Sequence, residues 1–152
     1  MLDLTNVEGS VHLKCEVVGY ESPEEARDDW CTVSVDVRQN EHRFMKRDPA
    51  LEATDLARIR QWFRCLADDR LPPSAHLGFT EPCIRFQFLA RGHDTVRFAI
   101  HLDHELRPSF PLEQFESNSN DWIVVFRATF SELSDLADAV GRAALKFPAR
   151  SS

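Results

Sequence analysis

The chain has 152 residues, of which 43% are hydrophobic, with eleven Phe and three Trp, and it carries a formal net charge of −7 at neutral pH. This length suits a single domain over residues 1–152, and the apolar content is enough for a sizeable core. The acidic balance argues against a surface for nucleic acid or anionic lipid, because such binding depends on clustered Lys and Arg. A charged partner is therefore expected to be basic.

The N-terminus has neither the basic segment nor the apolar run of a signal peptide, and no window approaches the ~20 apolar residues of a membrane span. A cytoplasmic location without membrane contact is predicted. The four cysteines, at positions 15, 31, 65 and 83, are widely spaced and include no C-x-x-C pair typical of a zinc site. Free thiols are favoured over a disulfide framework, since a domain of this size does not need cross-links. No cofactor is predicted.

The N-terminal part, residues 1–29, combines a strand with an acidic segment. Apolar and polar residues alternate from Val11 to Val18, as expected for a half-exposed strand. Residues 21–29 then contain five acidic side chains and one basic side chain. This segment is either a solvated loop or an electrostatic contact surface for a cationic partner.

A further alternating run begins at Trp30 and continues to Val37. A polar turn over residues 38–42 leads to a short return strand through Phe44 and Met45, so a hairpin is predicted. The prolines, Pro49 among them, are expected outside the periodic segments because proline cannot donate to a β-ladder or continue a helix.

An amphipathic helix is predicted over about residues 53–67, with Thr54 or Asp55 near its start. Its apolar stripe has spacings of three and four residues and consists of Leu56, Ile59, Phe63 and Leu66. Pro72 and Pro73 prevent any continuation.

Residues 76–104 predict a central β-hairpin. Two alternating runs, 84–88 and 96–102, flank the polar segment 90–94, which contains a Gly suited to a turn. Symmetric pairing places Phe86 opposite Phe98 and Ile84 opposite Ile100. One face would be apolar and the other would face water, with the polar side chains Arg85, Gln87, Arg97 and His101.

Residues 105–121 show no usable periodicity and end in turn-forming residues, so a long loop is predicted. Its apolar side chains Phe110, Leu112 and Phe115 either pack back over the sheet or form an exposed contact patch.

A last strand from Trp122 to Phe130 leads into a second amphipathic helix, with Ser131 as its N-cap. Its inner stripe is Leu133, Leu136, Val140 and Ala144. The order of a Trp-led strand and a helix occurs in residues 30–66 and again in 122–145, which is a weak internal symmetry. The predicted fold class is α+β: a predominantly antiparallel sheet of about six to eight strands with two amphipathic helices packed on one face.

Few residues of the sequence suggest a catalytic or metal-binding site. His101 and Asp103 would point to the same side of a strand and so could share a metal ion, although further ligands would be needed and His104 would point away. Cys83 follows Pro82 in the polar phase of its strand and is expected to be exposed, but nothing local lowers the pKa of its thiol. A metal-dependent or thiol enzyme using His101, Asp103 and Cys83 is one alternative, and an oligomeric structural protein with self-pairing strand edges is another.

The phrase Phe79-Thr80-Glu81-Pro82-Cys83-Ile84-Arg85-Phe86 precedes a further strand and a closing strand-helix unit. Together with the Trp30 strand and the helix after Thr54, it resembles the small bacterial proteins of the WapI immunity family over roughly residues 30–147. The resemblance implies a stoichiometric binder that neutralises the toxic C-terminal domain of a polymorphic toxin, with no catalytic residue to carry over.

The predicted function is accordingly that of a non-catalytic immunity protein, present as a monomer or homodimer, that binds a basic toxin domain directly. The candidate contacts lie in the acidic segment and in the long loop, and they are Glu24, Glu25, Asp28, Asp29, Glu113, Phe115 and Glu116.

Overall fold

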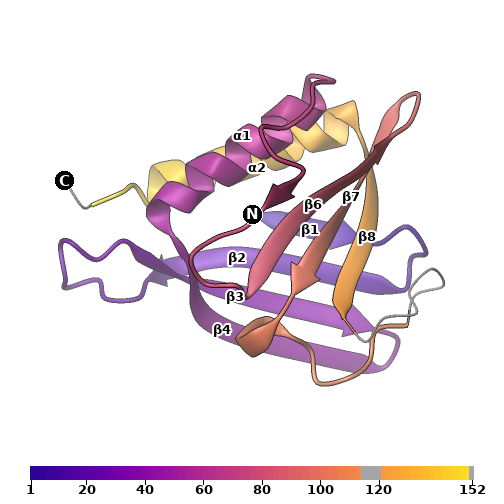
Figure 1. The fold of residues 1–152 in the computed structure, drawn as a ribbon. Coiled ribbons are helices and arrows are strands. Elements are labelled where there is room, and N and C mark those ends of the chain that lie inside the picture. The colour runs from indigo at the N-terminus through magenta and orange to yellow at the C-terminus, as the bar shows by residue number, and fades with distance from the viewer. Residues whose placement is uncertain (114–120, 151–152) are drawn as a thin grey trace.

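The computed structural model of the protein describes residues 1–113 and 121–150. These contain eight β-strands, two α-helices and one short 3-10 helix (Figure 1). In chain order the elements are β1 (Leu2–Thr5), β2 (Val11–Tyr20), β3 (Trp30–Gln39), β4 (His42–Glu52), α1 (Ala53–Ala67), β5 (His76–Leu77), β6 (Ile84–Arg91), β7 (Thr95–Leu102), η1 (His104–Leu106), β8 (Trp122–Thr129) and α2 (Phe130–Lys146).

The strands form two antiparallel meanders, β1-β2-β3-β4 (sheet A) and β5-β6-β7-β8 (sheet B). The α+β class and the strand number are as predicted, but the strands divide into two sheets where one was expected. Each sheet runs directly into a helix, β4 into α1 and β8 into α2. The internal symmetry is therefore a repeated order of four strands and one helix. Trp30 and Trp122 do not correspond in it, because Trp30 opens the third strand of its sheet and Trp122 the fourth.

The two helices lie side by side and run in opposite directions (Figure 1). A continuous cluster of buried side chains joins both sheets to both helices. At its centre the α1 residue Phe63 packs edge-on against Phe86 of β6 and Phe98 of β7, with ring centroids 5.6 and 5.5 Å away. Phe98 also stacks on Phe126 of β8 at 5.6 Å. Aromatic contacts of this kind fix α1 on the inner face of sheet B.

Helix α1 has the predicted bounds, and its first turn is closed by the Asp55 carboxylate, which accepts a hydrogen bond of 2.9 Å from the Glu52 backbone N–H. The predicted N-cap of α2 was wrong by two residues. Thr129 Oγ1 accepts from the Glu132 backbone N–H at 3.1 Å, and Glu132 accepts from the Thr129 N–H at 3.0 Å, which makes a capping box. In the described part of the chain, neither helix is long and apolar enough to span a membrane.

The predicted pairing of the central hairpin was wrong by two residues. Phe86 lies opposite Ile100, and Phe88 lies opposite Phe98. The strands extend further than expected, so that the turn is shorter and closes with a hydrogen bond of 2.8 Å from Gly92 N to Thr95 O. A bulge after Phe88 absorbs one extra residue. Because a shift of two residues preserves the side-chain phase, the predicted apolar face still meets the core.

Strand β4 is longer than the predicted short return and includes Pro49, which was expected outside the strands. The register between β3 and β4 shifts between Cys31, which pairs with Leu51, and Val33, which pairs with Asp48. Pro49 lies in this irregularity on an edge strand, where its missing N–H removes no ladder hydrogen bond. A proline and a bulge on an edge strand also oppose pairing between copies of the protein.

The segment after β7 begins with η1 and then packs back on the core, one of the two alternatives for its apolar residues. Phe110 stacks on His42 with ring centroids 4.9 Å apart. Its carbonyl accepts a hydrogen bond of 2.8 Å from the Trp122 indole N–H. Leu112 also packs against the core cluster, whereas Phe115 lies outside the described residues.

Candidate functional site

An open hollow of about 330 Å³ lies where the edge of sheet A meets the start of sheet B. Four separate segments supply its carboxylates: the 21–29 loop, β4, the residues before β6, and η1. Its lining residues are Glu21, Trp30, Asp48, Pro49, Glu81 and Glu105. The hollow thus gathers four acidic side chains around one aromatic residue.

Local backbone geometry positions the Glu105 side of the hollow. The Asp103 N–H donates to the Cys83 carbonyl at 2.9 Å, and the Leu106 N–H donates to the Asp103 carbonyl at 3.0 Å. Leu106 is fully buried and anchors η1. The turn also places His104 at a φ of 50°, an uncommon conformation for a residue other than glycine. Together these features hold Glu105 directly beside Cys83.

Cys83 lies at the base of this arrangement. Its Sγ is 3.2 Å from Glu105 Oε2 and 3.7 Å from Asp48 Oδ2. The residue is buried, so the expectation that it is exposed was wrong. Burial, followed by the hydrogen bond to Glu105 and the nearby Asp48 charge, raises the pKa of the Cys83 thiol to about 12. A thiol that keeps its proton at neutral pH is a hydrogen-bond donor and not an activated nucleophile.

The carboxylate that faces this thiol is stabilised in its ionised form. A hydrogen bond from its own backbone N–H, and then the one from Cys83, lower the pKa of Glu105. Asp48, Cys83 and Glu105 place three metal-ligating atoms within 4.8 Å of one another. A metal ion bound there would have to displace the thiol proton, which the raised pKa opposes. His101 and Asp103, the predicted metal pair, are not members of this group of described residues.

The thiols of the folded protein are expected to react slowly with iodoacetamide at pH 8. All four cysteines are buried and free, and burial raises the pKa of Cys15 to about 12 and of Cys31 to about 11. Alkylation counted by intact mass should be slow in buffer and complete in denaturant. Rapid modification of Cys83 in the folded protein would contradict this assignment.

His101 is buried with only 6% of its surface exposed, although it was predicted to face water. Arg85 Nη2 donates to its Nδ1 at 2.9 Å, and its Nε2 is 2.8 Å from Gln87 Oε1. Both ring nitrogens therefore have partners on β6, and the neutral ring with a proton on Nε2 satisfies both. Burial, then the charges of Arg85 and His76, lower the pKa of His101, while Asp103 and Asp121 oppose the shift more weakly.

The folded protein should lose stability when the pH falls below 6.5, the ordinary pKa of His101. In that range the unfolded chain takes up a proton at this site and the folded chain does not. The free energy of unfolding therefore becomes smaller as the pH falls. Urea unfolding of wild type and of His101→Gln at pH 7.5 and pH 5 measures this effect. The wild type should lose more stability on acidification than the variant, and equal losses would contradict the assignment.

The predicted acidic contacts at the 21–29 loop fall into two pairs. Glu24 and Glu25 are exposed to solvent. Asp28 and Asp29 are half-buried and make internal contacts: Asp28 Oδ1 accepts from the Trp30 N–H at 2.9 Å, and Asp29 Oδ1 accepts from the Arg150 N–H at 2.5 Å. Half of the predicted charge at this loop is therefore engaged within the protein.

The other predicted contact that the structure describes, Glu113, lies at the opposite end of β3. Its Oε2 accepts from Asn40 Nδ2 at 2.9 Å, and its N–H donates to Gln39 Oε1 at 2.8 Å. At about 3.3 Å per residue, the ten residues of β3 place this position roughly 30 Å from the acidic loop. Phe115 and Glu116 lie outside the described residues.

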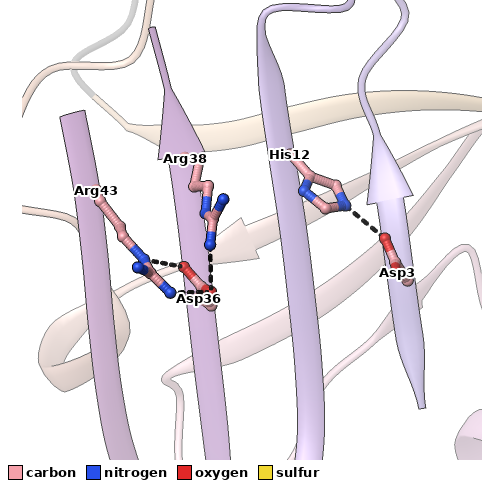
Figure 2. A network of polar contacts seen from close by, with 5 residues as sticks. All are labelled: Asp3, His12, Asp36, Arg38 and Arg43. Carbon is pink, nitrogen blue, oxygen red and sulfur yellow. Dashed lines mark hydrogen bonds and ion pairs between the residues drawn. The ribbon is translucent and has the colours of Figure 1, made fainter. Parts of the chain in front are cut away.

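The outer face of sheet A contrasts with the acidic hollow because its charges are paired (Figure 2). Arg43 binds Asp36 with two hydrogen bonds of 3.2 and 3.0 Å, and these lower the pKa of Asp36. His12 Nε2 lies 2.5 Å from Asp3 Oδ1 on the neighbouring strand. On this face, therefore, Asp36 and Asp3 each have a cationic or histidine partner on a neighbouring strand.

The sequence hypotheses missed most of the hollow. Glu81 stood in the quoted phrase before β6, but it was not chosen as a contact, and Glu21 was only part of an acidic segment. Asp48 and Glu105 carried no signal, since they become neighbours only through the meeting of the two sheets. Asp48-Pro49 inside an alternating strand is the local pattern that could have indicated an irregular edge.

The chain was compared with known proteins. A family model described as the Immunity protein WapI-like family matches residues 3–148. The match includes the N-terminal strands and the acidic loop, so the resemblance predicted over residues 30–147 was too short. No curated protein and no solved structure matches the chain. Because the family model covers nearly the whole sequence, this chain belongs to the WapI-like immunity protein family.

Proposed function

We propose that this protein neutralises a cognate bacterial toxin domain in the cytoplasm by direct, stoichiometric binding. Membership of the immunity family supports this role. The observation that carries it at the level of residues is the acidic edge, which we define as the hollow carboxylates together with the exposed acids of the neighbouring loop: Glu21, Glu24, Glu25, Asp48, Glu81 and Glu105.

The acidic edge suits a basic partner. Glu21 belongs both to the hollow and to the loop, so the two groups of carboxylates form one surface. A concentration of one sign of charge raises the rate at which an oppositely charged protein associates, and a hollow focuses that field. Trp30 lines the same hollow, and an aromatic residue beside carboxylates is a combination that favours Arg and Lys side chains.

The same site supports a binding role over the thiol or metal enzyme considered from the sequence. A thiol with a pKa of about 12 is a poor nucleophile at neutral pH. His101 has both ring nitrogens in hydrogen bonds with Arg85 and Gln87 of β6, whereas the Cys83 thiol lies against Glu105 and Asp48. The residues of the supposed enzyme site are thus assigned to separate local networks.

A growth assay tests the proposal. The C-terminal domain of the large secreted protein encoded beside this gene is expressed in a host with and without this chain. Rescue of growth and recovery of a complex of the two proteins are expected. If no neighbouring toxin gene exists, or if the domain arrests growth equally in both cases, the proposal fails.

A titration separates binding from catalysis. Purified toxin domain is mixed with increasing amounts of this protein, and its activity is expected to fall linearly and reach zero at an equimolar ratio. Complete inactivation by a small fraction of an equivalent would instead identify an enzyme that modifies the toxin.

A further inference from the structure

The guanidinium group of Arg150 occupies a site built by Tyr20 and the acidic loop. It lies over the Tyr20 ring, 3.8 Å from the centroid. Its Nε donates to the Asp28 carbonyl at 3.0 Å, Nη1 donates to the Pro23 carbonyl at 3.1 Å, and Nη2 donates to the Ser22 carbonyl at 3.0 Å and also to that of Asp28. All three nitrogens of the guanidinium are thus engaged by backbone oxygens.

This arrangement is specific for arginine. A guanidinium is planar and carries five N–H donors in a fixed fork, so it can stack on a ring while donating in several directions in its own plane. A lysine ammonium is a compact point charge and cannot match three carbonyls spread along a loop in this way. The nearby acidic side chains attract either cation. The three carbonyls, in contrast, favour the guanidinium of arginine, because only its N–H donors match their positions.

The loop is ordered by its own hydrogen bonds. The Glu21 N–H donates to the Trp30 carbonyl at 2.8 Å, the Glu25 N–H to Ser22 at 3.0 Å, and the Asp28 N–H to Glu25 at 3.0 Å. The Trp30 N–H is bound by the Asp28 carboxylate. None of these bonds involves residues 147–150, so Tyr20 and the loop should keep their shape when the Arg150 side chain leaves.

The occupant, by contrast, is a short segment beyond the end of α2. It is held by the Arg150 contacts, by a hydrogen bond of 2.5 Å from the Tyr20 hydroxyl to the Pro148 carbonyl, and by an edge contact of Phe147 with Tyr20. The hydrogen bond from the Arg150 N–H to Asp29 Oδ1 completes this set of contacts, and these are the contacts that must break for the segment to leave the site.

We propose that Tyr20 and residues 22–28 form an arginine-binding site, and that its resident occupant Arg150 exchanges with an arginine side chain of the toxin. The second half of this statement rests on the proposed function. The site lies next to Glu24 and Glu25, within the acidic loop that approaches the hollow through Glu21. A toxin arginine would enter it with its charge already attracted by the acidic edge.

The test of the site itself needs no toxin. Tyr20 is the only tyrosine of the chain, so its ring signals in an NMR spectrum of tyrosine-labelled protein are unambiguous. In Arg150→Ala, N-acetyl-L-arginine amide should shift these signals saturably, with a Kd on the order of millimolar. The apparent affinity of the wild type for this compound should be at least roughly tenfold lower, because its own Arg150 side chain already fills the site.

N-acetyl-L-lysine amide is the control and should bind much more weakly than the arginine compound. Equal binding of the two would show attraction by charge alone and would overturn the proposal. A second spectrum, of tryptophan-labelled Arg150→Ala, reports on the loop through Trp30. Loss of the Trp30 signal from its wild-type position would also overturn the proposal, because the loop would then depend on Arg150 for its shape. Arg150→Lys should behave like Arg150→Ala toward the arginine probe.

Exchange with the toxin is tested separately by affinity. Arg150→Ala should bind the toxin domain at least roughly fivefold more tightly than wild type, since no competitor has to be displaced. Unchanged or weaker binding would overturn the exchange. If the toxin binds neither protein while the arginine probe still binds the variant, the proposed function fails and the arginine site stands.

Discussion

Replacing Phe63 with Ala is expected to lower the free energy of unfolding by about 3–5 kcal/mol. Phe63 is fully buried and joins α1 to sheet B through Phe86 and Phe98, at 5.6 and 5.5 Å between ring centroids. Its removal deletes apolar contacts and leaves a cavity among rigid rings that cannot easily close over it. A loss of this size is a large part of the 5–15 kcal/mol that typically stabilises a domain.

Urea unfolding followed by tryptophan fluorescence measures the change. Met45→Ala is the matched control, since Met45 is 59% exposed on the outer face of sheet A and its truncation should cost less than about 0.5 kcal/mol. A loss below about 1.5 kcal/mol for Phe63→Ala would mean that this aromatic cluster does not hold α1 on sheet B. The wild type should unfold in one cooperative transition, which tests the prediction of a single domain.

Reversing charge in the hollow is expected to weaken toxin binding by about tenfold or more, or about 1.4 kcal/mol. The variant Glu21→Lys/Glu81→Lys changes two side chains that line the hollow and are exposed to solvent, so the fold should be preserved. Most of the loss should appear in the association rate, because the field of the acidic edge acts before contact. Glu24→Lys/Glu25→Lys tests the loop in the same way and should have a smaller effect, because its carboxylates lie outside the hollow.

The control is Asp94→Lys/Asp135→Lys, which makes the same change in net charge at two exposed positions, on the β6–β7 turn and on α2. Its affinity for the toxin should stay within about twofold of wild type. If the control loses as much affinity as the hollow variant, the effect comes from net charge and the acidic edge has no particular role. Added salt should weaken wild-type binding more than binding of the hollow variant.

Local patterns predicted the secondary structure well. Alternation of apolar and polar residues located β2, β3, β6, β7 and β8, but β1 was not predicted and β4 was predicted too short. Spacings of three and four located α1 at its observed bounds, because side-chain phase follows directly from backbone geometry. Errors occurred where two local signals competed. Thr129 and Ser131 both suit a helix N-cap, and only Thr129 has a glutamate three residues later to complete the capping box.

Pairing between segments was predicted less well. The symmetric hairpin register ignored the bulge after Phe88, and a single sheet was expected where two form. The polar phase of β7 predicted an exposed His101, yet its neighbours Arg85 and Gln87 bury it and satisfy both ring nitrogens. Burial of a polar residue depends on partners from another strand, which the residue's own segment does not reveal.

The sequence by itself determined the α+β class, the acidic character, the acidic loop and the family, since composition, periodicity and a short phrase are properties of contiguous residues. Only the tertiary structure decided that Asp48, Glu81 and Glu105 share a hollow, that Cys83 is a buried thiol beneath them, and that Arg150 lies in the acidic loop more than 120 residues away. The physical reason is the same in each case. These contacts depend on the relative placement of two sheets and a chain end, which is set by packing of the whole core and not by any local preference.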